Sequence, residues 1–455
     1  MAGGNWTGQN KVRPGAYVNV ASKEGVKASE ATTGVVTLPL PLDFGPEKKV
    51  VEVVADTDLT PFGYNIGDEK MLLLREALKQ AAKVLVYRIG TGDKAVANGG
   101  PVTATALYGG ARGNKINVTS EANVNVEGAF DVKTFLDGSL VDTQTVKDAK
   151  DLVANRLVTF TGEGPVEAFS DLLAGGKDTA GSAQDYADYF SAVQVFDFNV
   201  MALPVTDEAV KTAGAAFVKR LRDEEGKKCQ LVVAGYKGDN EAIINVKNGV
   251  ILSDGKRIDA VQATAWVAGA EASAGVATSL TYKKYDGAVD VTQRFLNTEI
   301  IAALNAGEFL FTEKRGEAVV EQDINSLTSF TSEKGKSFSK NRVLRVLGDI
   351  ANNTRIAFEE NYIGKINNDQ DRRELFKADR IAYFNSLQAA GAITNFDAED
   401  VEVLPGEAKD AIVMNAAVQP VDAMEKLYAT VNLSDSGSTT SGGATSGASG
   451  GTTTP

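Results

Sequence analysis

Strand-like segments lie at both ends of this chain, and neither has a partner segment nearby. Near the start, residues 11–20 alternate apolar and polar side chains around a Pro-Gly break; residues 411–414 and 427–433 alternate similarly near the end. The backbone N–H and C=O groups of a strand must pair, so these segments need partners in distant parts of the chain or in another copy. Extended, the first twenty residues reach on the order of 60 Å, far enough to cross to a neighbouring subunit. The pattern therefore favours assembly over catalysis.

Composition excludes several classes of protein. At 455 residues the chain is long enough for about two to four domains, and its 43% apolar and 24% charged residues are typical of soluble globular proteins. No apolar run approaches the roughly 18 residues that span a bilayer. The stretch 260–280 comes nearest, but Gln262 and Glu271 interrupt it, and the N-terminus lacks the features of a secretory signal. The net charge of −13 disfavours nucleic acid as a partner.

The chain has no histidine and one cysteine, Cys229. The missing histidine removes the commonest general base and the commonest metal ligand. Carboxylates, lysines and tyrosines still allow catalysis, so an α/β enzyme remains an alternative. Cys229 begins an apolar, strand-like segment, which indicates a small core side chain, and a single cysteine fits folding in a reducing cytoplasm.

Strand–helix–strand patterns predict an α/β domain. An amphipathic helix at 70–83 precedes a strand at 84–89. A strand at 195–203 precedes a helix with Thr206 as its predicted N-cap, and a further strand follows at 229–235. Near-continuous apolar strands connected by helices predict a parallel sheet covered on both faces.

A β-rich segment interrupts this pattern at 91–177. Residues 116–119, 124–127 and 132–140 alternate with period two, and Gly and Asp turns separate them. The glycine-rich residues 109–114 are followed by strand-like residues and not by a helix, so they indicate a shaped turn and not a dinucleotide site. A hairpin is predicted later, at 307–323, with its turn at 314–317.

The last structured block begins with a helix at 339–362. Its predicted apolar stripe is Val343, Leu347, Ile350, Thr354 and Phe358, and its predicted polar face is Arg342, Arg345, Asp349, Asn352 and Glu359. A second helix is predicted from Asp371, capped with Glu374, and has a core of Phe376, Tyr383 and Leu387. A strand follows at 400–404. In 434–455, 18 of 22 residues are Gly, Ser or Thr, which predicts a disordered tail.

No motif in the chain predicts a catalytic, cofactor or metal site. Residues 333–337 contain a Gly-Lys-Ser fragment, but Phe330 stands where a phosphate loop needs glycine. Two carboxylate pairs lack the spacing of a calcium loop: Asp56 with Asp58, and Asp369 with Asp371.

Five positive charges fall within twelve residues, with Glu333 as the one nearby acid. They are Lys334, Lys336, Lys340, Arg342 and Arg345. Such a run forms either a solvated face or a contact with an acidic partner.

Several stretches in this order resemble contractile tail sheath proteins of the kind found in phages and prophages of Gram-positive bacteria. They are RPGAYVNV at 13–20, LYGGARGNKI at 107–116, QDINSL at 322–327, KNRVLR at 340–345, and residues 401–419. The likeness covers nearly all of residues 1–433. The alternatives to a sheath are the α/β enzyme and a non-contractile shell or surface-layer protein.

The resemblance implies a multidomain fold of the α/β plus α+β class. It comprises a subtilisin-like α/β middle domain, a β-sandwich-like insert, an α+β C-terminal domain and extended terminal β arms. The predicted division is an arm at 1–33, a middle domain at 34–90 and 178–325, the insert at 91–177, the C-terminal domain at 326–433 and the tail at 434–455. Without histidine, the chain cannot carry the subtilisin triad.

The resemblance also implies a structural subunit without cofactors, which forms helically stacked hexameric rings around a tail tube and contracts to drive the tube through the target cell envelope. Its partners would be other copies, the tube protein, and baseplate and tail terminator proteins, in a virion tail or bacteriocin particle assembled in the host cytoplasm. The five basic residues would face the tube. The exchanged arms would include Pro14, Gly15, Tyr17, Val18, Val20, Ile412, Val413, Met414, Leu427, Tyr428, Val431 and Leu433, and the last strand is expected to be the one that crosses.

Overall fold

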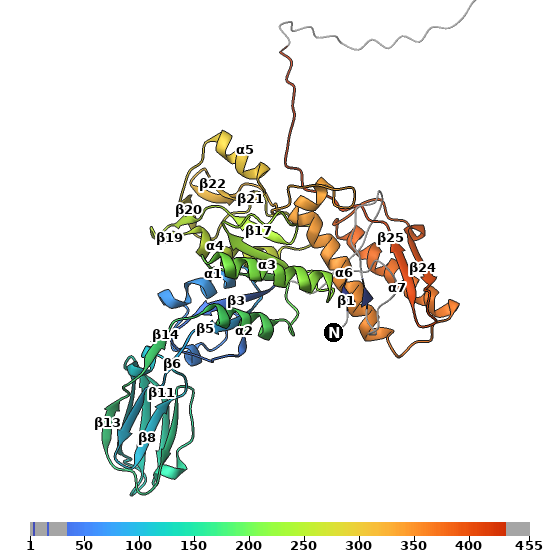
Figure 1. The fold of residues 1–455 in the computed structure, drawn as a ribbon. Coiled ribbons are helices and arrows are strands. Elements are labelled where there is room, and N and C mark those ends of the chain that lie inside the picture. Colours follow the sequence, from blue (N-terminus) through green and yellow to red (C-terminus); the bar gives the residue numbers. More distant parts are fainter. Residues whose placement is uncertain (1–2, 5–15, 18–33, 434–455) are drawn as a thin grey trace, which may run out of the picture. The chain divides into compact units, whose positions relative to one another are not determined.

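The structure is a computed structural model that describes residues 3–4, 16–17 and 34–433 (Figure 1). Its described residues up to Asp422 belong to one compact unit, and Ala423 begins a second. The predicted tail at 434–455 and most of the predicted N-terminal arm lie outside the described residues. No helix in the described part of the chain is long and apolar enough to cross a membrane.

A seven-stranded sheet forms the centre of the compact unit. Its order is β21-β17-β16-β15-β3-β5-β4, and every neighbouring pair is parallel except β4 with β5. The strands are β3 (Val35–Pro41), β4 (Val50–Val53), β5 (Lys83–Ile89), β15 (Val200–Ala202), β16 (Gln230–Ala234), β17 (Ile243–Val246) and β21 (Glu308–Phe309). The predicted parallel sheet is confirmed, with one antiparallel strand added at its edge.

Helices cover both faces of this sheet because its strands are apolar on both sides. Along β5, Val84 and Val86 join one core cluster, whereas Leu85 and Tyr87 join the other. The first face is covered by α1 (Leu72–Leu78) and α4 (Ala260–Ser273), and the second by α2 (Ala183–Val193) and α3 (Glu208–Asp223).

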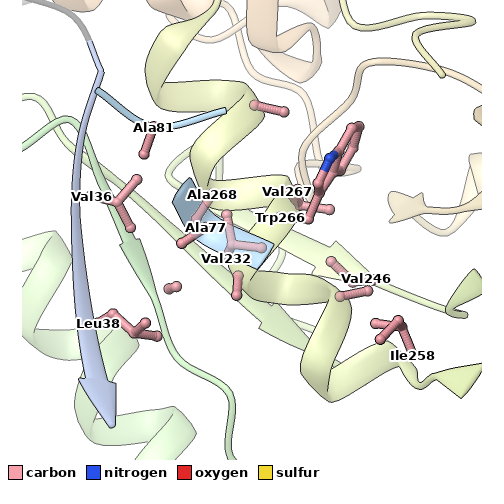
Figure 2. Close-up of a cluster of buried hydrophobic side chains, with 14 of the residues drawn as sticks. Val36, Leu38, Ala77, Ala81, Val232, Val246, Ile258, Trp266, Val267 and Ala268 are labelled. Atoms are coloured by element: carbon pink, nitrogen blue, oxygen red, sulfur yellow. The ribbon is translucent and has the colours of Figure 1, made fainter. Parts of the chain in front are cut away.

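The helix α4 is buried nearly all round, and small side chains allow its close approach to α1. A Cβ atom on Gly269 would lie 2.5 Å from the carbonyl oxygen of Ala77. Figure 2 shows Val36 and Val232 of the sheet beside Ala77 and Ala268 of these two helices.

Element boundaries differ from the predictions where local capping decides them. The helix predicted from residue 70 begins as a short 3-10 turn, and its α-helical part is only α1. The N-cap of α3 is Asp207 and not Thr206, because the Asp207 carboxylate accepts hydrogen bonds from Ala209 N (2.8 Å) and Val210 N (3.3 Å).

The insert is a β-sandwich. One sheet has the order β12-β8-β7 and the other β11-β10-β9-β13. The strands are β7 (Val96–Gly99), β8 (Val102–Ala106), β9 (Ile116–Ala122), β10 (Phe130–Leu136), β11 (Ser139–Val146), β12 (Val158–Gly162) and β13 (Phe169–Leu172). The prediction of a strand at 124–127 is wrong: this segment is the β9–β10 turn, held by Asn123 Oδ1 accepting from Asn125 N and Val126 N.

A buried arginine joins the insert to the central sheet. The Arg88 guanidinium, at the end of β5, donates to the carbonyl oxygens of Leu42 (3.0 Å), Gly45 (2.9 Å) and Gly109 (3.0 Å). A second link is the antiparallel pair β6 (Thr91–Asp93) and β14 (Lys177–Thr179). The glycine-rich residues 109–114 form the predicted shaped turn, since Gly110 has φ 129° and lies against Asp43.

A small sheet and a hairpin complete the central part of the chain. The sheet comprises β18 (Val250–Leu252), β19 (Arg257–Ile258) and β20 (Ala288–Val291), and α5 (Asn297–Asn305) follows it. The predicted hairpin is confirmed as β22 (Phe311–Lys314) and β23 (Glu317–Val320). Its two turn residues, Arg315 and Gly316, both have positive φ, as a tight hairpin turn requires.

The C-terminal part packs two helices against a two-stranded sheet. They are α6 (Asn341–Asn361), α7 (Gln370–Ala389), β24 (Val401–Pro405) and β25 (Ile412–Ala416). The N-cap of α7 is Asp369 and not Asp371, because the Asp369 carboxylate accepts from Arg372 N at 2.9 Å. Of the predicted core of α6, Val343, Leu347, Ile350 and Thr354 are buried and Phe358 is not.

The junction glycine provides a test of this architecture. A Cβ atom on Gly110 would lie 1.7 Å from the Asp43 carbonyl oxygen, whereas nothing lies within 4 Å of a Cβ atom on Gly128, which also has positive φ. We expect Gly110→Ala to destabilise the protein by about 2 kcal/mol or more and Gly128→Ala by about 1 kcal/mol. Urea unfolding measures both, and equal losses would contradict the proposed close packing at the junction.

Candidate assembly surfaces

The two-stranded sheet of the C-terminal part has room for more strands. β24 and β25 pair antiparallel, with Val403 opposite Met414, and each has no second partner strand among the described residues. Val401 is buried, and Met414 packs against the same apolar cluster as α6 and α7. One face of this small sheet is therefore anchored on a core, and neither of its outer edges pairs with another strand among the described residues.

The chain runs back toward α7 after β25. Val421 N donates to the carbonyl oxygen of Ala392 at 2.9 Å, and Ile393 forms a β-bridge with Pro420. Ile412, Val413 and Met414 thus have an intrachain partner strand in β24. Of the other predicted C-terminal arm residues, Leu427, Tyr428, Val431 and Leu433 belong to no strand pair among the described residues.

Residues 423–433 contain no helix, strand or bridge, so the predicted strand at 427–433 is not formed within the single chain. Their large side chains are almost fully exposed: Met424, Leu427, Tyr428, Val431 and Leu433 expose 104, 89, 89, 92 and 88% of their surface. In an extended conformation, Leu427, Val431 and Leu433 would lie on one face. Contiguous exposed apolar side chains mark an interaction site in a soluble protein.

Little of the predicted N-terminal arm is described. Ala16 and Tyr17 form β2, which pairs parallel with β1 (Gly3–Gly4). Pro14, Gly15, Val18 and Val20 lie outside the described residues. Their assignment to the arm stays a prediction.

The five basic residues do not form one face. Lys336 is exposed, Lys334 Nζ lies 2.6 Å from Glu241 Oε1, and Lys340 Nζ lies 3.6 Å from Asp422 Oδ2. Arg342 and Arg345 are largely buried and bonded within the chain. The predicted polar face of α6 is wrong for these two arginines. Arg345 packs against Glu271 and Asp323 of the central domain, and Arg342 donates to the carbonyl oxygen of Gly391, just after α7.

Arg345 is held by two carboxyl groups that the sequence did not link to it. Its guanidinium contacts Glu271 Oε2, lies 2.9 Å from Asp323 Oδ2 and donates to the Thr278 carbonyl oxygen at 2.5 Å. Glu271 was visible in the sequence as an acidic residue within an otherwise small and apolar helix. Nothing in the spacing of the chain indicated its partner, because the two residues are 74 positions apart.

A polar cavity of about 230 Å³ lies beside Lys334. Its lining residues are Lys219, Arg222, Asp223, Asn240, Glu241 and Lys334. Burial would raise the pKa of Glu241, but Arg222 and Lys334 outweigh it and hold this pKa below its ordinary value. Burial and the nearby Arg222 lower the pKa of Lys228, beside the cavity, to about 8. The cavity is therefore lined by three basic and two acidic side chains.

The remaining candidate residues have structural roles. Cys229 is buried, and burial raises the pKa of its thiol to about 11, so it is a core side chain and not a nucleophile. Asp58 accepts from Thr60 N and pairs with Arg156, and Asp369 caps α7. Within the described ranges, no three His, Cys, Asp or Glu residues form a group that could hold a metal ion.

Comparisons with known proteins agree with this architecture. Four tail sheath family profiles match successive parts of the chain: "Tail sheath protein Gp18 domain III N-terminal region" (33–89), "Phage tail sheath protein beta-sandwich domain" (90–183), "Phage tail sheath protein central domain" (180–326) and "Phage tail sheath C-terminal domain" (333–434). The phage-like element PBSX protein XkdK of Bacillus subtilis is 42% identical over 95% of this chain and 100% of its own length. The chain belongs to the phage tail sheath family.

Solved structures support the same assignment. The sheath tail protein of Desulfitobacterium hafniense has a TM-score of 0.80 and 47% identity, covering 91% of this chain and 99% of its own. The helical sheath of the anti-feeding prophage in its contracted state has a TM-score of 0.53 at 14% identity, covering 92% of this chain and 99% of its own, and shows the shared fold alone. This sheath protein is therefore a structural subunit of a contractile tail and not an enzyme.

Two substitutions test the corrected placement of the basic residues. Arg345→Met leaves two buried carboxyl groups without their cation, so we expect a loss of about 3–5 kcal/mol of stability. Lys336→Met removes an exposed cation, and we expect a change within about 0.5 kcal/mol. Chemical unfolding of the two variants measures the difference. A similar, small effect of both would contradict the buried position of Arg345.

Proposed function

We propose that this sheath subunit joins its neighbours by adding terminal strands to the β24–β25 sheet, in hexameric rings stacked helically around a tail tube. The open edges of that sheet and the exposed apolar segment at 423–433 carry the proposal. The anti-feeding prophage protein, which has the same fold, forms a helical sheath, and this supports a helical arrangement of the present subunits.

The energetics of strand addition suit a link that must hold under load. Each main-chain hydrogen bond across the new edge contributes roughly 0.5–1.5 kcal/mol net. Burial of each large apolar side chain, such as Leu427 or Val431, adds about 1.5–3 kcal/mol before the entropy of ordering the segment is subtracted. Because Leu427, Val431 and Leu433 share one face, that face extends the apolar cluster under β24 and β25.

Strand exchange keeps subunits connected while their compact bodies move. The links repeat around every ring, so the loss of one does not release a subunit. We infer that the extended sheath is kinetically trapped and that a baseplate signal starts contraction toward a packing of lower free energy. The work of driving the tube through the cell envelope then comes from stored conformational free energy, and no nucleotide is needed.

The proposed domain division fits this mechanism because it separates the compact part of the subunit from the terminal segments that link it to its neighbours. We infer an arm at 1–33, a subtilisin-like middle domain at 34–90 and 178–325, the insert at 91–177, the C-terminal domain at 326–433 and a tail beyond. The separate apolar clusters of the insert and of the C-terminal helices support these limits. The particle would be a virion tail or a bacteriocin, assembled in the host cytoplasm and completed by baseplate and terminator proteins.

Contact with an acidic tail tube is proposed for the exposed part of the basic run. Arg345 is engaged by Glu271 and Asp323, whereas the exposed Lys336 forms no ion pair among the described residues. Lys334 remains partly exposed beside Glu241. Charges at the exposed edge of an interface determine the register of the two partners and their rate of association more than their affinity.

Two point variants test the terminal strand. Val431→Asp places a charge on the predicted buried face of the added strand, so we expect purified protein to lose its tubes in negative-stain electron microscopy. The matched Thr430→Asp variant carries the same charge on the opposite face and should still form tubes. Normal tubes from Val431→Asp would rule out the exchange of this segment, whereas flat sheets or closed shells from the unmodified protein would favour a non-contractile shell.

A charge reversal tests the contact with the tube. We expect Lys336→Glu to reduce co-assembly with the tube protein in a pull-down at low salt, because it replaces attraction with repulsion. The control is Lys94→Glu, which reverses an exposed lysine of the insert. Equal recovery of tube protein by both variants would remove Lys336 from the interface.

A further inference from the structure

Three ionisable side chains lie buried together where α6 packs on the central domain. The side chain of Glu271, in α4, exposes none of its surface; Asp323, after β23, exposes 1% and Arg345, in α6, 9%. Glu271 and Asp323 belong to the part matched as the central domain, and Arg345 to the part matched as the C-terminal domain. The cluster therefore bridges the two domains with two acids and one strong base.

The hydrogen bonds of this cluster leave one carboxylate oxygen without a donor. Asn341 Nδ2 donates to Glu271 Oε1 at 3.0 Å, and Arg345 donates to Glu271 Oε2. Asp323 Oδ2 accepts from Arg345 and from Leu280 N, both at 2.9 Å. Among the described residues, Asp323 Oδ1 is buried and has no hydrogen-bond donor, and Arg345 Nε is buried and has no acceptor. A buried oxygen of an ionised carboxylate without a donor is strongly unfavourable.

A proton on Glu271 gives the cluster a further hydrogen-bond donor. The two carboxyl groups are neighbours around one guanidinium, because Arg345 contacts both Glu271 Oε2 and Asp323 Oδ2. With both ionised, two negative charges would face a single guanidinium in a site closed to water, and like charges so placed cannot both persist. With one proton between them, the cluster is neutral.

The surroundings favour Glu271 as the acid that keeps the proton. Burial and the neighbouring Asp323 raise the pKa of Glu271 well above its ordinary value, although Arg345 acts against this. Burial also opposes ionisation of Asp323, but Arg345 and the hydrogen bond from Glu271 outweigh it and lower its pKa. Among the described residues, Arg342 also lies near the cluster: its charge acts on Asp323, it donates to the Gly391 carbonyl oxygen, and Asp422 lies near it in turn.

We propose that Glu271 and Asp323 share one proton at neutral pH and, with Arg345, form a proton-dependent clamp between the central and C-terminal domains. Loss of the proton leaves an excess negative charge at a dry interface and favours separation of α6 from α4. The clamp would be tightest in acid solution and loosen progressively as the pH rises from the ordinary glutamate range to the raised pKa of Glu271. This property is additional to strand exchange, which uses other residues.

The sign of the pH dependence follows from the raised pKa of Glu271. Below the ordinary glutamate pKa of about 4.3, the closed and opened states both hold the proton, so the clamp has its full strength. Between that pH and the raised pKa of the closed state, the closed state binds one proton more, and each pH unit shifts the equilibrium about tenfold toward opening. Above the raised pKa of Glu271, a further rise in pH no longer changes the opening equilibrium. Asp323, with a lowered pKa, weakens the interface only as the pH falls below the ordinary carboxyl range.

Infrared spectroscopy of the full-length protein gives a direct test. At pH 7 we expect the carbonyl band of a protonated, buried carboxylic acid, which disappears as the pH rises. Glu271→Gln should lack the band, and so should Asp323→Asn, in which Glu271 faces Arg345 alone and ionises. The control Glu127→Gln, on an exposed turn of the insert, should keep it. A wild-type spectrum without the band, or a band that survives in Glu271→Gln, would overturn the shared proton.

Hydrogen exchange of the α6 amides tests the clamp itself. After correction for the intrinsic rate, opening of α6 in the wild type should increase up to tenfold per pH unit through the window. Glu271→Gln and Asp323→Asn should lose this increase, and Glu127→Gln should retain it. The Asn variant gives an independent measurement if the Gln variant does not fold. The same pH dependence in all four proteins would mean that the acid pair does not control the interface.

Discussion

Burial of the central sheet on both faces is the constraint on which the rest of the structure depends. Seven strands with apolar side chains on either side need helices above and below, and α1 with α4 and α2 with α3 supply them. That arrangement leaves only the sheet edges, the strand ends and the outer helix surfaces for other domains. The insert attaches at the end of β5, and α6 attaches along α4 and at the start of β16.

Both attachments use a buried arginine. Arg88 binds three backbone carbonyl groups that come together only when β5, the loop after β3 and the turn at 109–114 have folded. Arg345 binds two acidic side chains and a carbonyl oxygen from the central domain. A planar guanidinium with five N–H donors suits such junctions because it satisfies several carbonyl or carboxyl groups at once.

Much of the fold was predictable because its periodicity is local. The parallel strands, their helices, the β-rich insert and the hairpin at 314–317 all follow from apolar spacing and turn residues. The errors have physical reasons. At Thr206 and Asp371 a nearby aspartate caps the helix better, and at 124–127 an asparagine turn overrides the alternation of valines. The prediction that Arg342 and Arg345 lie on a polar face failed because a charged residue in a sequence can be buried. The acids that pair with Arg345 are distant in the chain, so nothing in the sequence indicated them.

By itself, the sequence determined that both ends of this protein carry strand-like segments, that its centre is a buried α/β sheet and that its chemistry excludes a histidine-based site. These are consequences of side-chain type and local spacing. Only the tertiary structure decided that Ile412–Ala416 pairs with β24, while residues 427–433 form no strand within the described part of the chain. The reason is that strand pairing and charge burial depend on which distant segments meet. The same holds for Glu271, Asp323 and Arg345, whose shared environment exists only after α6 has packed on the central domain.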